Sequence, residues 1–455
     1  MLEADDIAKG IGEMLLHQQG DPPISGFPRA VVDSRQVEPG DLFVALRGQR
    51  QDGHDFILDA AERGAAGVMV EKGLPDYPRG VAAFQVTDCL EALQRLAAYK
   101  RSSQTLRVIG ITGSVGKTTC KELTAAVLSQ RYVTLKSEGN LNTEIGLPLT
   151  LLELTERHQA AVLEMGMLAP GDIALLCRIA QPQVGLITNI GPVHLERLGS
   201  LEAIASAKAE IIEALPAPEG TAVLNGDDPM VCQLATRTQA RVVFYGSGKD
   251  CQVRGSHLRS YGLDGFSFRI TYGGQSQEVK MSLPGKHNLH NALAAAAVAL
   301  LEGISLEEIV EALSRARMQN RLRLLAGPAG SRILDDSYNA SPASMLAALD
   351  LLAETRGRKL ALLGDMRELG AAEEEGHRRV GQWAARTTDV LLVIGEKAEL
   401  IAEAARQSGH ADVRVLPDKK AAAEMLKRDL RMGDYLLVKA SRAMALETVV
   451  EALGG

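Results

Sequence analysis

Residues 110–119, which read GITGSVGKTT, constrain the fold of this chain more than any other segment. The run before them, residues 106–112, is rich in apolar and β-branched side chains, as expected of a buried strand. After the loop, Cys120, Leu123 and Val127 recur at the spacing of one helix face. A glycine-rich turn between a strand and a helix lets backbone N–H groups surround phosphate oxygens, and the helix N-terminus adds positive potential. The segment therefore predicts a phosphate-binding loop in a parallel sheet.

Each residue of this loop has a predicted role in binding a nucleotide. Lys117 is expected to reach the β- and γ-phosphates, and the Thr118 hydroxyl is expected to hold Mg²⁺. The residues predicted to bind ATP here are Gly113, Ser114, Val115, Gly116, Lys117, Thr118 and Thr119. The usual GxxxxGK[ST] spacing is broken at one position, because Ile111 stands where the first glycine belongs. The alternative is a glycine-rich turn in which Gly-Lys-Thr occurs by chance.

The composition excludes several classes of protein. The 455 residues are enough for about three domains. The formal net charge of −7 and the absence of a Lys/Arg-rich block argue against general nucleic-acid binding. The longest apolar run, residues 292–301, is half of the roughly 20 residues that a membrane-spanning helix needs. The first residues are acidic, and the five cysteines form no CxxC pair, so we expect a cytoplasmic protein with neither a disulfide framework nor a zinc site.

The order of apolar runs predicts an α/β fold with three domains, at residues 1–102, 103–318 and 319–455. The first is a small α/β unit that ends in a polar stretch, residues 100–104, interpreted as a linker. The second is a largely parallel sheet built around the phosphate-binding loop. The third alternates five strand candidates with four helical patterns, as an open Rossmann-like sheet does.

Two side chains of the second domain follow predicted strands. Glu164 ends one strand, and His194 lies just beyond another. Because ligands bind at the carboxyl ends of parallel strands, these two side chains are candidates for holding divalent ions. The alternatives are a solvated carboxylate and a loop histidine that bonds the backbone.

Lys208 has an unusual position in the predicted helix 200–215. It falls on the apolar face formed by Leu201, Ile204, Ile211 and Leu215. A lysine on such a face is costly unless it is paired or neutral. It either extends its stem to water or is an amine of lowered pKa, open to covalent modification.

The chain resembles the Mur ligases, the ATP-dependent amide-forming enzymes of peptidoglycan precursor synthesis. The resemblance extends over nearly the whole chain and is strongest with the members that add D-alanyl-D-alanine. The matching segments, in this order, are residues 33–35, 40–46, 110–119, 139–150, 164–167, 189–196, 207–211, 285–292, 335–340, 364–370 and 438–442.

The resemblance implies three domains: an N-terminal one for the UDP-sugar, a central one for ATP, and a mobile Rossmann-like C-terminal one. It also implies a reaction. The terminal carboxylate of UDP-N-acetylmuramoyl-tripeptide attacks the γ-phosphate of ATP, an acyl phosphate forms, and the amine of D-alanyl-D-alanine displaces phosphate. The implied cofactors are ATP and Mg²⁺, and the implied state is a monomer.

The resemblance assigns roles to particular residues. Lys117, Glu164, His194 and Lys208 are implied as catalytic. Thr118, Glu164, His194 and Lys208, the last as a carbamate formed with CO₂, are implied as metal ligands. Asn291, Arg321 and Asp336 are implied to contact the nucleotide. The implied substrate-binding residues are Ser34, Arg35, Asn142, Thr143, Tyr338, Asn339, Lys439, Ser441 and Arg442.

Three positions depart from the family pattern, and some matches have a structural alternative. Val115 replaces a polar residue, Thr143 replaces a second Asn, and Ala440 stands where Gly is common. Asn288 or Asn291 could cap a helix that starts near Leu289, and Ser441 could cap a helix entry. Arg321 could be an exposed hinge charge, and Asp336-Ser337 could be an ordinary turn.

Three other functions compete with this interpretation. The neighbouring Mur ligase that adds the third amino acid carries an Asp-Asn-Pro-Arg motif, which is absent here, where residues 335–340 occupy the comparable region. Folylpolyglutamate synthase shares the ATP core, but its phosphate-binding loop lies much nearer the N-terminus. A P-loop switch or motor would hydrolyse ATP without a peptide substrate.

Overall fold

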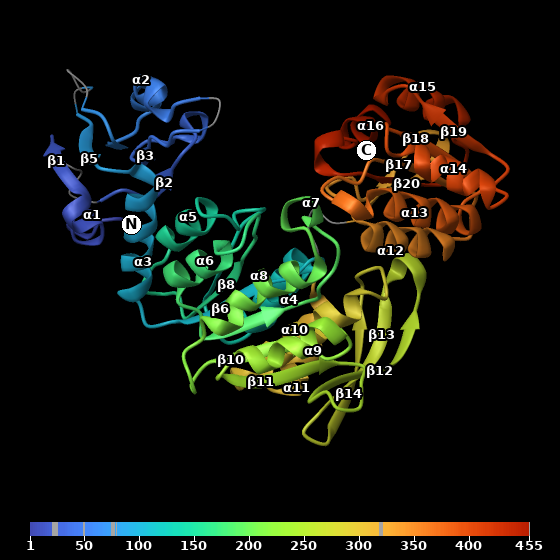
Figure 1. Cartoon of the computed structure of the whole chain (residues 1–455), viewed down its shortest axis with the longest axis horizontal. Coiled ribbons are helices and arrows are strands. Elements are labelled where there is room, and N and C mark those ends of the chain that lie inside the picture. The colour runs from blue at the N-terminus through green and yellow to red at the C-terminus, as the bar shows by residue number, and fades with distance from the viewer. Residues whose placement is uncertain (21–25, 49–50, 74–77, 79, 318–321, 455) are drawn as a thin grey trace.

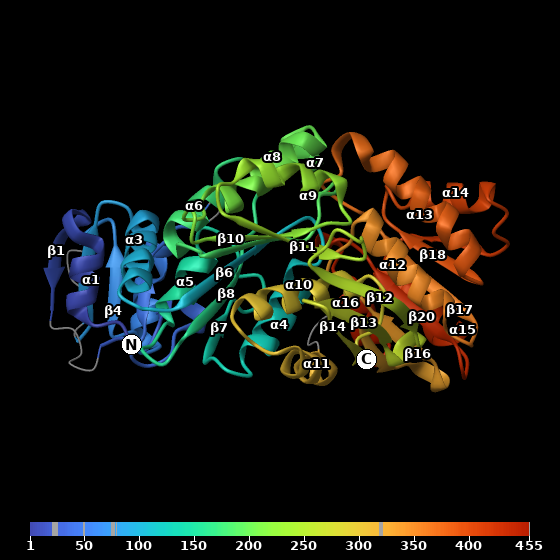
Figure 2. The ribbon, with the colours of Figure 1, turned by 90° about the horizontal axis from the view of Figure 1, so that it is seen from below.

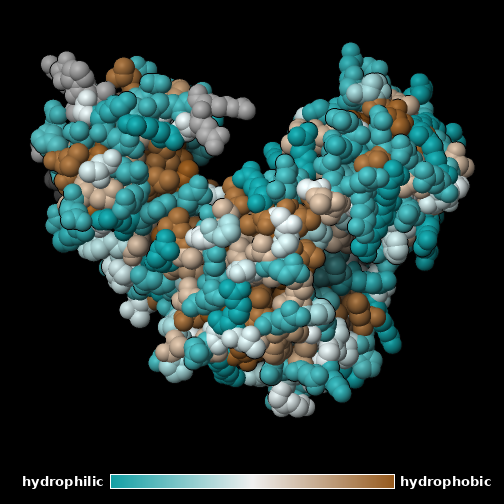
Figure 3. Space-filling view, in the orientation of Figure 1, coloured by the Kyte–Doolittle hydropathy of each residue, from teal (hydrophilic) through white to brown (hydrophobic). Residues whose placement is uncertain are grey.

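Three β-sheets follow one another along the chain, which confirms the predicted α/β class with three sheet-containing parts (Figure 1). The computed structural model describes residues 1–455 except 21–25, 49–50, 74–77, 79, 318–321 and 455. We call the three parts the N-terminal lobe (β1–β5), the central lobe (β6–β14) and the C-terminal lobe (β15–β20). The lobes lie in a row when seen from below (Figure 2). A deep notch separates the N-terminal and C-terminal lobes in the space-filling view (Figure 3).

The N-terminal lobe holds a five-stranded sheet with the order β1-β5-β4-β3-β2. Its strands are β1 (Leu15–Gln19), β2 (Ala30–Val31), β3 (Leu42–Val44), β4 (Gly67–Val70) and β5 (Ala82–Val86), of which only β1 pairs antiparallel. Its helices are α1 (Ala4–Ile11), α2 (Ile57–Glu62) and α3 (Cys89–Ser102). One apolar cluster continues from this lobe into the central lobe, so these two lobes share a core.

The linker predicted at residues 100–104 is wrong for residues 100–102, which form the last turn of α3, with Ser103 as its C-cap. Arg101 is 5% exposed, and its guanidinium donates hydrogen bonds to the carbonyl oxygens of Ala180, at 2.9 Å, and Gln104, at 3.1 Å. Ala180 ends α6, where helix carbonyls lack partners inside the helix. The charged residues therefore join two helices, although their polarity is typical of a linker.

The central lobe holds a nine-stranded sheet with the order β14-β13-β12-β11-β10-β9-β6-β8-β7. Its strands are β6 (Arg107–Thr112), β7 (Thr134–Lys136), β8 (Ala160–Glu164), β9 (Val184–Ile187), β10 (Thr221–Asn225), β11 (Arg241–Gly246), β12 (Val253–Ser260), β13 (Phe266–Tyr272) and β14 (Gln275–Met281). The pairs from β7 to β12 are parallel, as predicted for the core of this part. The pairs β12–β13 and β13–β14 are antiparallel, which the sequence pattern did not reveal.

The helices of the central lobe are α4 (Lys117–Leu128), α5 (Gly146–Leu152), α6 (Asp172–Ala180), α7 (Leu195–Leu198), α8 (Leu201–Glu213), α9 (Pro229–Gln233), α10 (Asn288–Leu301) and α11 (Leu306–Arg315). Helix α10 packs against α4 through a run of alanines, and residues 292–299 are all buried. Small side chains let the two helices approach closely. This contact brings the start of α10 beside the glycine-rich loop.

The C-terminal lobe holds a six-stranded sheet with the order β15-β16-β20-β17-β18-β19. Its strands are β15 (Arg323–Ala326), β16 (Arg332–Asp335), β17 (Lys359–Gly364), β18 (Val390–Ile394), β19 (Val413–Leu416) and β20 (Tyr435–Lys439), and only β15 runs antiparallel. Its helices are α12 (Pro342–Ala353), α13 (Glu373–Thr387), α14 (Glu399–Gln407), α15 (Lys419–Asp429) and α16 (Glu447–Ala452). Two apolar clusters belong to this lobe, which confirms an open sheet covered on both faces. None of the helices in the described ranges has both the length and the apolar composition of a membrane span.

Candidate active site

The glycine-rich loop joins β6 to α4 and has two glycines with positive φ, Gly113 at +146° and Gly116 at +89°. A Cβ atom on Gly113 would overlap the hydroxyl of Thr188. A Cβ atom on Gly116 would lie 2.6 Å from the side-chain oxygen of Asn291, at the start of α10. Both positions therefore need glycine for two reasons, a left-handed backbone and a close neighbour.

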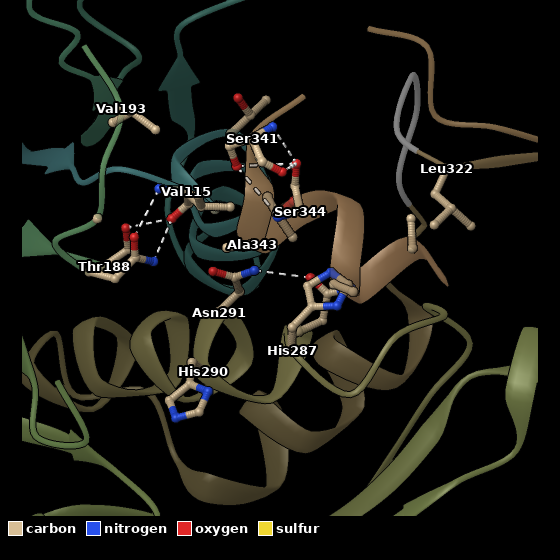
Figure 4. Close-up of a pocket in the computed structure, with 18 of the residues that line it drawn as sticks. Val115, Thr188, Val193, His287, His290, Asn291, Leu322, Ser341, Ala343 and Ser344 are labelled. Atoms are coloured by element: carbon tan, nitrogen blue, oxygen red, sulfur yellow. Dashed lines mark hydrogen bonds between the residues drawn. The ribbon is translucent and has the colours of Figure 1, made fainter. Parts of the chain in front are cut away.

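The end of β9 holds this loop in place. The Asn189 side-chain amide donates to the carbonyl oxygen of Val115 at 2.8 Å, and its oxygen accepts the Val115 N–H at 2.9 Å. The Thr188 hydroxyl donates to the same carbonyl at 2.8 Å, as Figure 4 shows. The Ser114 side-chain oxygen accepts the Gly191 N–H at 2.8 Å. We did not predict Asn189 or Thr188, although their place directly after a buried strand was the signal that singled out Glu164.

Lys117 lies at the start of α4, and its ammonium group donates to the carbonyl oxygen of Gly113 at 2.7 Å. Lys208 is on α8 and is only 2% exposed, so the interpretation that its stem reaches water is wrong. Within the described part of the chain, no hydrogen bond or ion pair holds its amine. Burial lowers the pKa of Lys208 well below its ordinary value, and the nearby charge of Lys117 adds to the effect.

Glu164 ends β8 and collects two side-chain donors. The Thr118 hydroxyl donates to one carboxylate oxygen at 2.9 Å, and the Asn142 amide donates to the other at 2.8 Å. Glu164 is 3% exposed, and its backbone N–H donates to the Ser137 hydroxyl at 3.1 Å. The structure thus brings together two residues implied as metal ligands, Thr118 and Glu164, and one implied as substrate-binding, Asn142. Thr143 instead faces the start of α5, where its hydroxyl accepts the Gly146 N–H at 3.3 Å.

His194 precedes α7 with a positive φ of 58°. Its Nδ1 atom lies 2.6 Å from a carboxylate oxygen of Glu368, which belongs to the C-terminal lobe. The contact with His194 holds the pKa of Glu368 below its ordinary value, despite the opposing effect of burial. The contact with Glu368 therefore joins His194 of the central lobe to the C-terminal lobe.

No group of three His, Cys, Asp or Glu side chains among the described residues is arranged to hold a metal ion. The pair formed by Thr118 and Glu164 nevertheless suits Mg²⁺. Hydroxyl and carboxylate oxygens are hard ligands, and Mg²⁺ at phosphate sites needs only one or two protein carboxylates because phosphates and water complete its shell. The residues present therefore fit Mg²⁺ that arrives with a nucleotide.

A cavity of about 470 Å³ opens beside the loop, between the central and C-terminal lobes (Figure 4). Central-lobe residues line one side, among them Val115, Gly116, Thr118, Thr119, Thr188, Asn189, His287, Asn288, His290 and Asn291. C-terminal-lobe residues line the other, among them Leu322, Asp336, Ser341, Ala343, Ser344, Ala348 and Lys439. The lining includes six of the ten residues predicted to bind ATP. Arg321 lies outside the described residues.

The two asparagines at the start of α10 do not cap the helix with their side chains. The Asn291 amide donates to the Asn288 side-chain oxygen at 2.9 Å, and the Asn288 amide donates to the Pro284 carbonyl at 2.8 Å. The residue in the capping position is His287, which makes no capping hydrogen bond with its side chain. The asparagines instead form part of the cavity wall, so the capping interpretation is wrong.

Residues predicted to bind substrate gather at the carboxyl ends of β16 and β20. Lys439 is 1% exposed, forms an ion pair with Asp336 and donates to the Asn339 carbonyl at 2.9 Å. The Arg442 guanidinium lies over the Tyr338 ring, 5.6 Å from its centroid. Ser441 occupies the N-cap position of the short helical turn that follows it, as the capping interpretation expected, but its hydroxyl makes no capping bond and accepts the Arg367 N–H at 2.8 Å.

The remaining two predicted residues lie in the N-terminal lobe. Ser34 is 7% exposed and opens a short helical turn. The Arg35 side chain is exposed and forms an ion pair of 2.8 Å with Asp33. This pairing lowers the pKa of Asp33 to about 2. Neither residue lines the cavity beside the loop.

Comparison with known proteins identifies the class to which this fold and site belong. Three family models match consecutive parts of the chain: "Mur ligase family, catalytic domain" at residues 31–101, "Mur ligase middle domain" at residues 111–299, and "Mur ligase, glutamate ligase domain" at residues 320–442. The chain belongs to the Mur ligase family.

Particular members of this family are similar over nearly their whole length. UDP-N-acetylmuramoyl-tripeptide–D-alanyl-D-alanine ligase of Bacillus subtilis is 39% identical, and that of Escherichia coli is 38% identical, each over 92% of both chains. A crystal structure of MurF from Acinetobacter baumannii matches with a TM-score of 0.87 and 31% identity, covering 99% of this chain and 98% of that one. MurF ligase of Thermotoga maritima in complex with ADP matches with a TM-score of 0.81 and 32% identity, covering 93% and 96%.

Proposed function

We propose that this chain is an ATP-dependent ligase that joins D-alanyl-D-alanine to UDP-N-acetylmuramoyl-tripeptide and so forms UDP-N-acetylmuramoyl-pentapeptide for peptidoglycan synthesis. One observation carries the proposal: relatives with this activity in their names align over 92% of both chains at 38–39% identity. The cavity beside the glycine-rich loop is consistent with it, because its walls come from the two lobes that the reaction must bring together. The neighbouring ligase that adds diaminopimelate is only 20% identical, a likeness that concerns the fold alone.

The residues of the loop and the cavity bind ATP in this proposal. Backbone N–H groups of residues 113–119 surround the phosphates at the start of α4. Thr118, Glu164, His194 and a carbamylated Lys208 would hold Mg²⁺. When bound, Mg²⁺ supplies positive charge that offsets the charge on the transferring phosphoryl group. The Lys117 ammonium group, which now donates to the Gly113 carbonyl, turns to a phosphate oxygen and adds to this charge.

The reaction consists of two chemical displacement steps, one after the other. The tripeptide carboxylate forms a bond to the γ-phosphorus while the bond to ADP breaks, which gives an acyl phosphate. The amine of D-alanyl-D-alanine then adds to the acyl carbon, loses a proton and expels phosphate. Positioning and charge neutralisation carry such transfers, because little covalent help is required from the protein. Ser34, Arg35, Asn142 and Thr143 bind the UDP-sugar peptide, and Tyr338, Asn339, Lys439, Ser441 and Arg442 bind the peptide substrates from the C-terminal lobe.

The C-terminal lobe moves during the reaction in this proposal. It has apolar clusters of its own, and it holds His194 through Glu368, so the histidine must be released before it can serve a metal ion. Small-angle X-ray scattering with an ATP analogue, Mg²⁺ and UDP-N-acetylmuramoyl-tripeptide is expected to show a smaller radius of gyration than the free protein. An unchanged scattering curve with saturating ligands would contradict the movement.

The chain acts as a monomer in the cytoplasm in this proposal, where ATP and UDP-sugar peptides are available, and it binds no nucleic acid.

The test of function is phosphate release from ATP and Mg²⁺, with UDP-N-acetylmuramoyl-tripeptide and D-alanyl-D-alanine added singly and together. We expect phosphate only with both substrates, together with the pentapeptide product by mass spectrometry. Rapid release with neither substrate would instead favour a P-loop switch. Release with the UDP-muramoyl dipeptide and a single amino acid would favour the neighbouring ligase step.

A further inference from the structure

Glu354 joins the C-terminal lobe to the central lobe at a point away from the reacting groups. It follows the last residue of α12. One carboxylate oxygen lies 2.8 Å from the Lys286 ammonium group, and the other accepts a hydrogen bond from the Ser260 hydroxyl. Burial raises the pKa of Glu354, but the bonds from Lys286 and Ser260 outweigh it, so the net pKa is lowered and the carboxylate is charged.

The two elements that Glu354 connects are opposite walls of the cavity. Lys286 lies in the segment between β14 and α10, directly before His287 and Asn288, which line the cavity. On the other side, the N-cap residue of α12, Ser341, and the first half of the helix, with Ala343 and Ser344, line the cavity. Figure 4 shows these α12 residues and His287 on facing sides of the cavity. One helix therefore has its N-terminal half at the cavity and its C-terminal end held to the central lobe.

Apolar contact accompanies the ion pair but does not fix its geometry. Leu263, in the turn between β12 and β13, packs against the core of the C-terminal lobe. Leu322 packs against the same core and also lines the cavity. Leu263 thus joins the two lobes without directional preference, because apolar attraction follows the area buried. The bonds to Glu354 are directional, so they set where α12 stands relative to α10.

We propose that Glu354 is a positioning residue for nucleotide binding, which fixes the distance between α12 and the start of α10 through Lys286 and Ser260. The inference rests on the proposed function, because it takes the cavity as the nucleotide site. Glu354 touches neither the loop nor the side chains assigned to the metal and the phosphates. Its replacement therefore changes how tightly the nucleotide binds and leaves the chemistry of the bound complex unaltered.

The expected effect is modest, because the pair is partly solvated. The Glu354 side chain is 27% exposed, and that of Lys286 is 57% exposed. Pairs of this kind contribute up to about 1 kcal/mol, which corresponds to about a fivefold change in an equilibrium constant. Glu354→Gln is expected to weaken ADP binding about three- to fivefold, measured by isothermal titration calorimetry, and to raise KM for ATP equally with kcat unchanged.

Three further variants complete the design. Glu354→Lys, which faces Lys286 with a like charge, is expected to weaken ADP binding more than Glu354→Gln does. The exchanged pair Lys286→Glu with Glu354→Lys is expected to restore most of that loss. Glu213→Gln breaks a matched pair within the central lobe, where Glu213 lies 2.6 Å from Arg237 with side chains 36% and 37% exposed. This control is expected to leave ADP binding unchanged, and thermal unfolding shows that each variant folds.

The outcomes separate the inference from the function on which it rests. Unchanged ADP affinity in Glu354→Gln, an equal loss in Glu213→Gln, or no recovery in the exchanged pair would overturn the positioning role while the proposed function stands. A fall in kcat with unchanged KM would also overturn it. Absence of ADP binding by the unaltered protein would overturn the proposed nucleotide site and this inference together.

Discussion

Lys117→Met is expected to lower the rate of ADP formation by about a thousandfold. The ammonium group lies at the start of α4, 2.7 Å from the Gly113 carbonyl at the turn that surrounds the phosphates. In the reaction it is the one mobile positive charge that the loop itself provides. Methionine keeps the length of the side chain and removes the charge, so the loss falls on the transfer of the phosphoryl group. Steady-state measurement of ADP release with both substrates checks this.

A control separates charge at the site from charge in general. Lys280→Met removes a lysine from the exposed side of β14 and is expected to leave the rate unchanged. Lys117→Met should also unfold within a few degrees of the unaltered protein, because the side chain is only half-buried. A variant that keeps more than a tenth of the activity would contradict the assigned role of Lys117.

Lys208→Met is expected to lower activity by about a hundredfold and to raise stability at the same time. The amine is buried at 2% exposure, without a hydrogen bond or an ion pair within the described residues, so its burial costs free energy. Methionine fills the same volume without that cost, and a gain of about 1–3 kcal/mol in the free energy of unfolding follows. Parallel measurement of ligase activity and chemical denaturation checks both changes.

Carbamylation of Lys208, which is proposed above, can be detected directly by its carbon resonance. A neutral amine adds CO₂, forms an N–C bond and releases a proton, which converts the buried group into an anion able to face Mg²⁺. Protein equilibrated with ¹³C-bicarbonate is expected to show a carbamate carbon resonance that is absent from Lys208→Met. Absence of this signal, with activity indifferent to removal of bicarbonate, would contradict carbamylation.

The pH dependence of stability follows from the same burial. Because the pKa of Lys208 is lowered in the folded state, the unfolded chain binds more protons between that value and the ordinary value of 10.5. In protein free of CO₂, the free energy of unfolding therefore rises with pH across this window. Lys208→Met removes this contribution, so the difference in stability between the two proteins narrows as the pH increases.

The sequence predicted the parts of the site that lie within one continuous segment. The loop at residues 110–119 contains its own glycines, lysine and threonine, and its conformation depends mainly on residues next to one another. Strand ends could also be located, because a buried strand is a short apolar run. Glu164 and His194 were found in this way, and so was the position of Lys208 on an apolar helix face.

Contacts between segments far apart in the chain could not be predicted from local sequence patterns. Thr118 and Glu164 are 46 positions apart, Asn142 and Glu164 are 22 apart, and Ser260 and Glu354 are 94 apart. Polar stretches are also misleading, since the composition of residues 100–102 is typical of a linker, whereas these residues end α3 and Arg101 donates to the Ala180 carbonyl. The antiparallel strands β12–β14 were missed because strand pairing depends on partners elsewhere in the chain.

The sequence by itself therefore determined the chemistry that this chain carries: a phosphate-binding loop, carboxylate and imidazole groups after strands, and a lysine on an apolar helix face. Local order and spacing are enough for this, because each feature depends on residues within one element. Only the tertiary structure decided which of these groups meet. The depth at which Lys208 is buried, the pairing of Glu164 with Thr118 and Asn142, and the cavity wall built by α12 all depend on the packing of separate elements. Packing is a collective property of many side chains, and no short segment contains it.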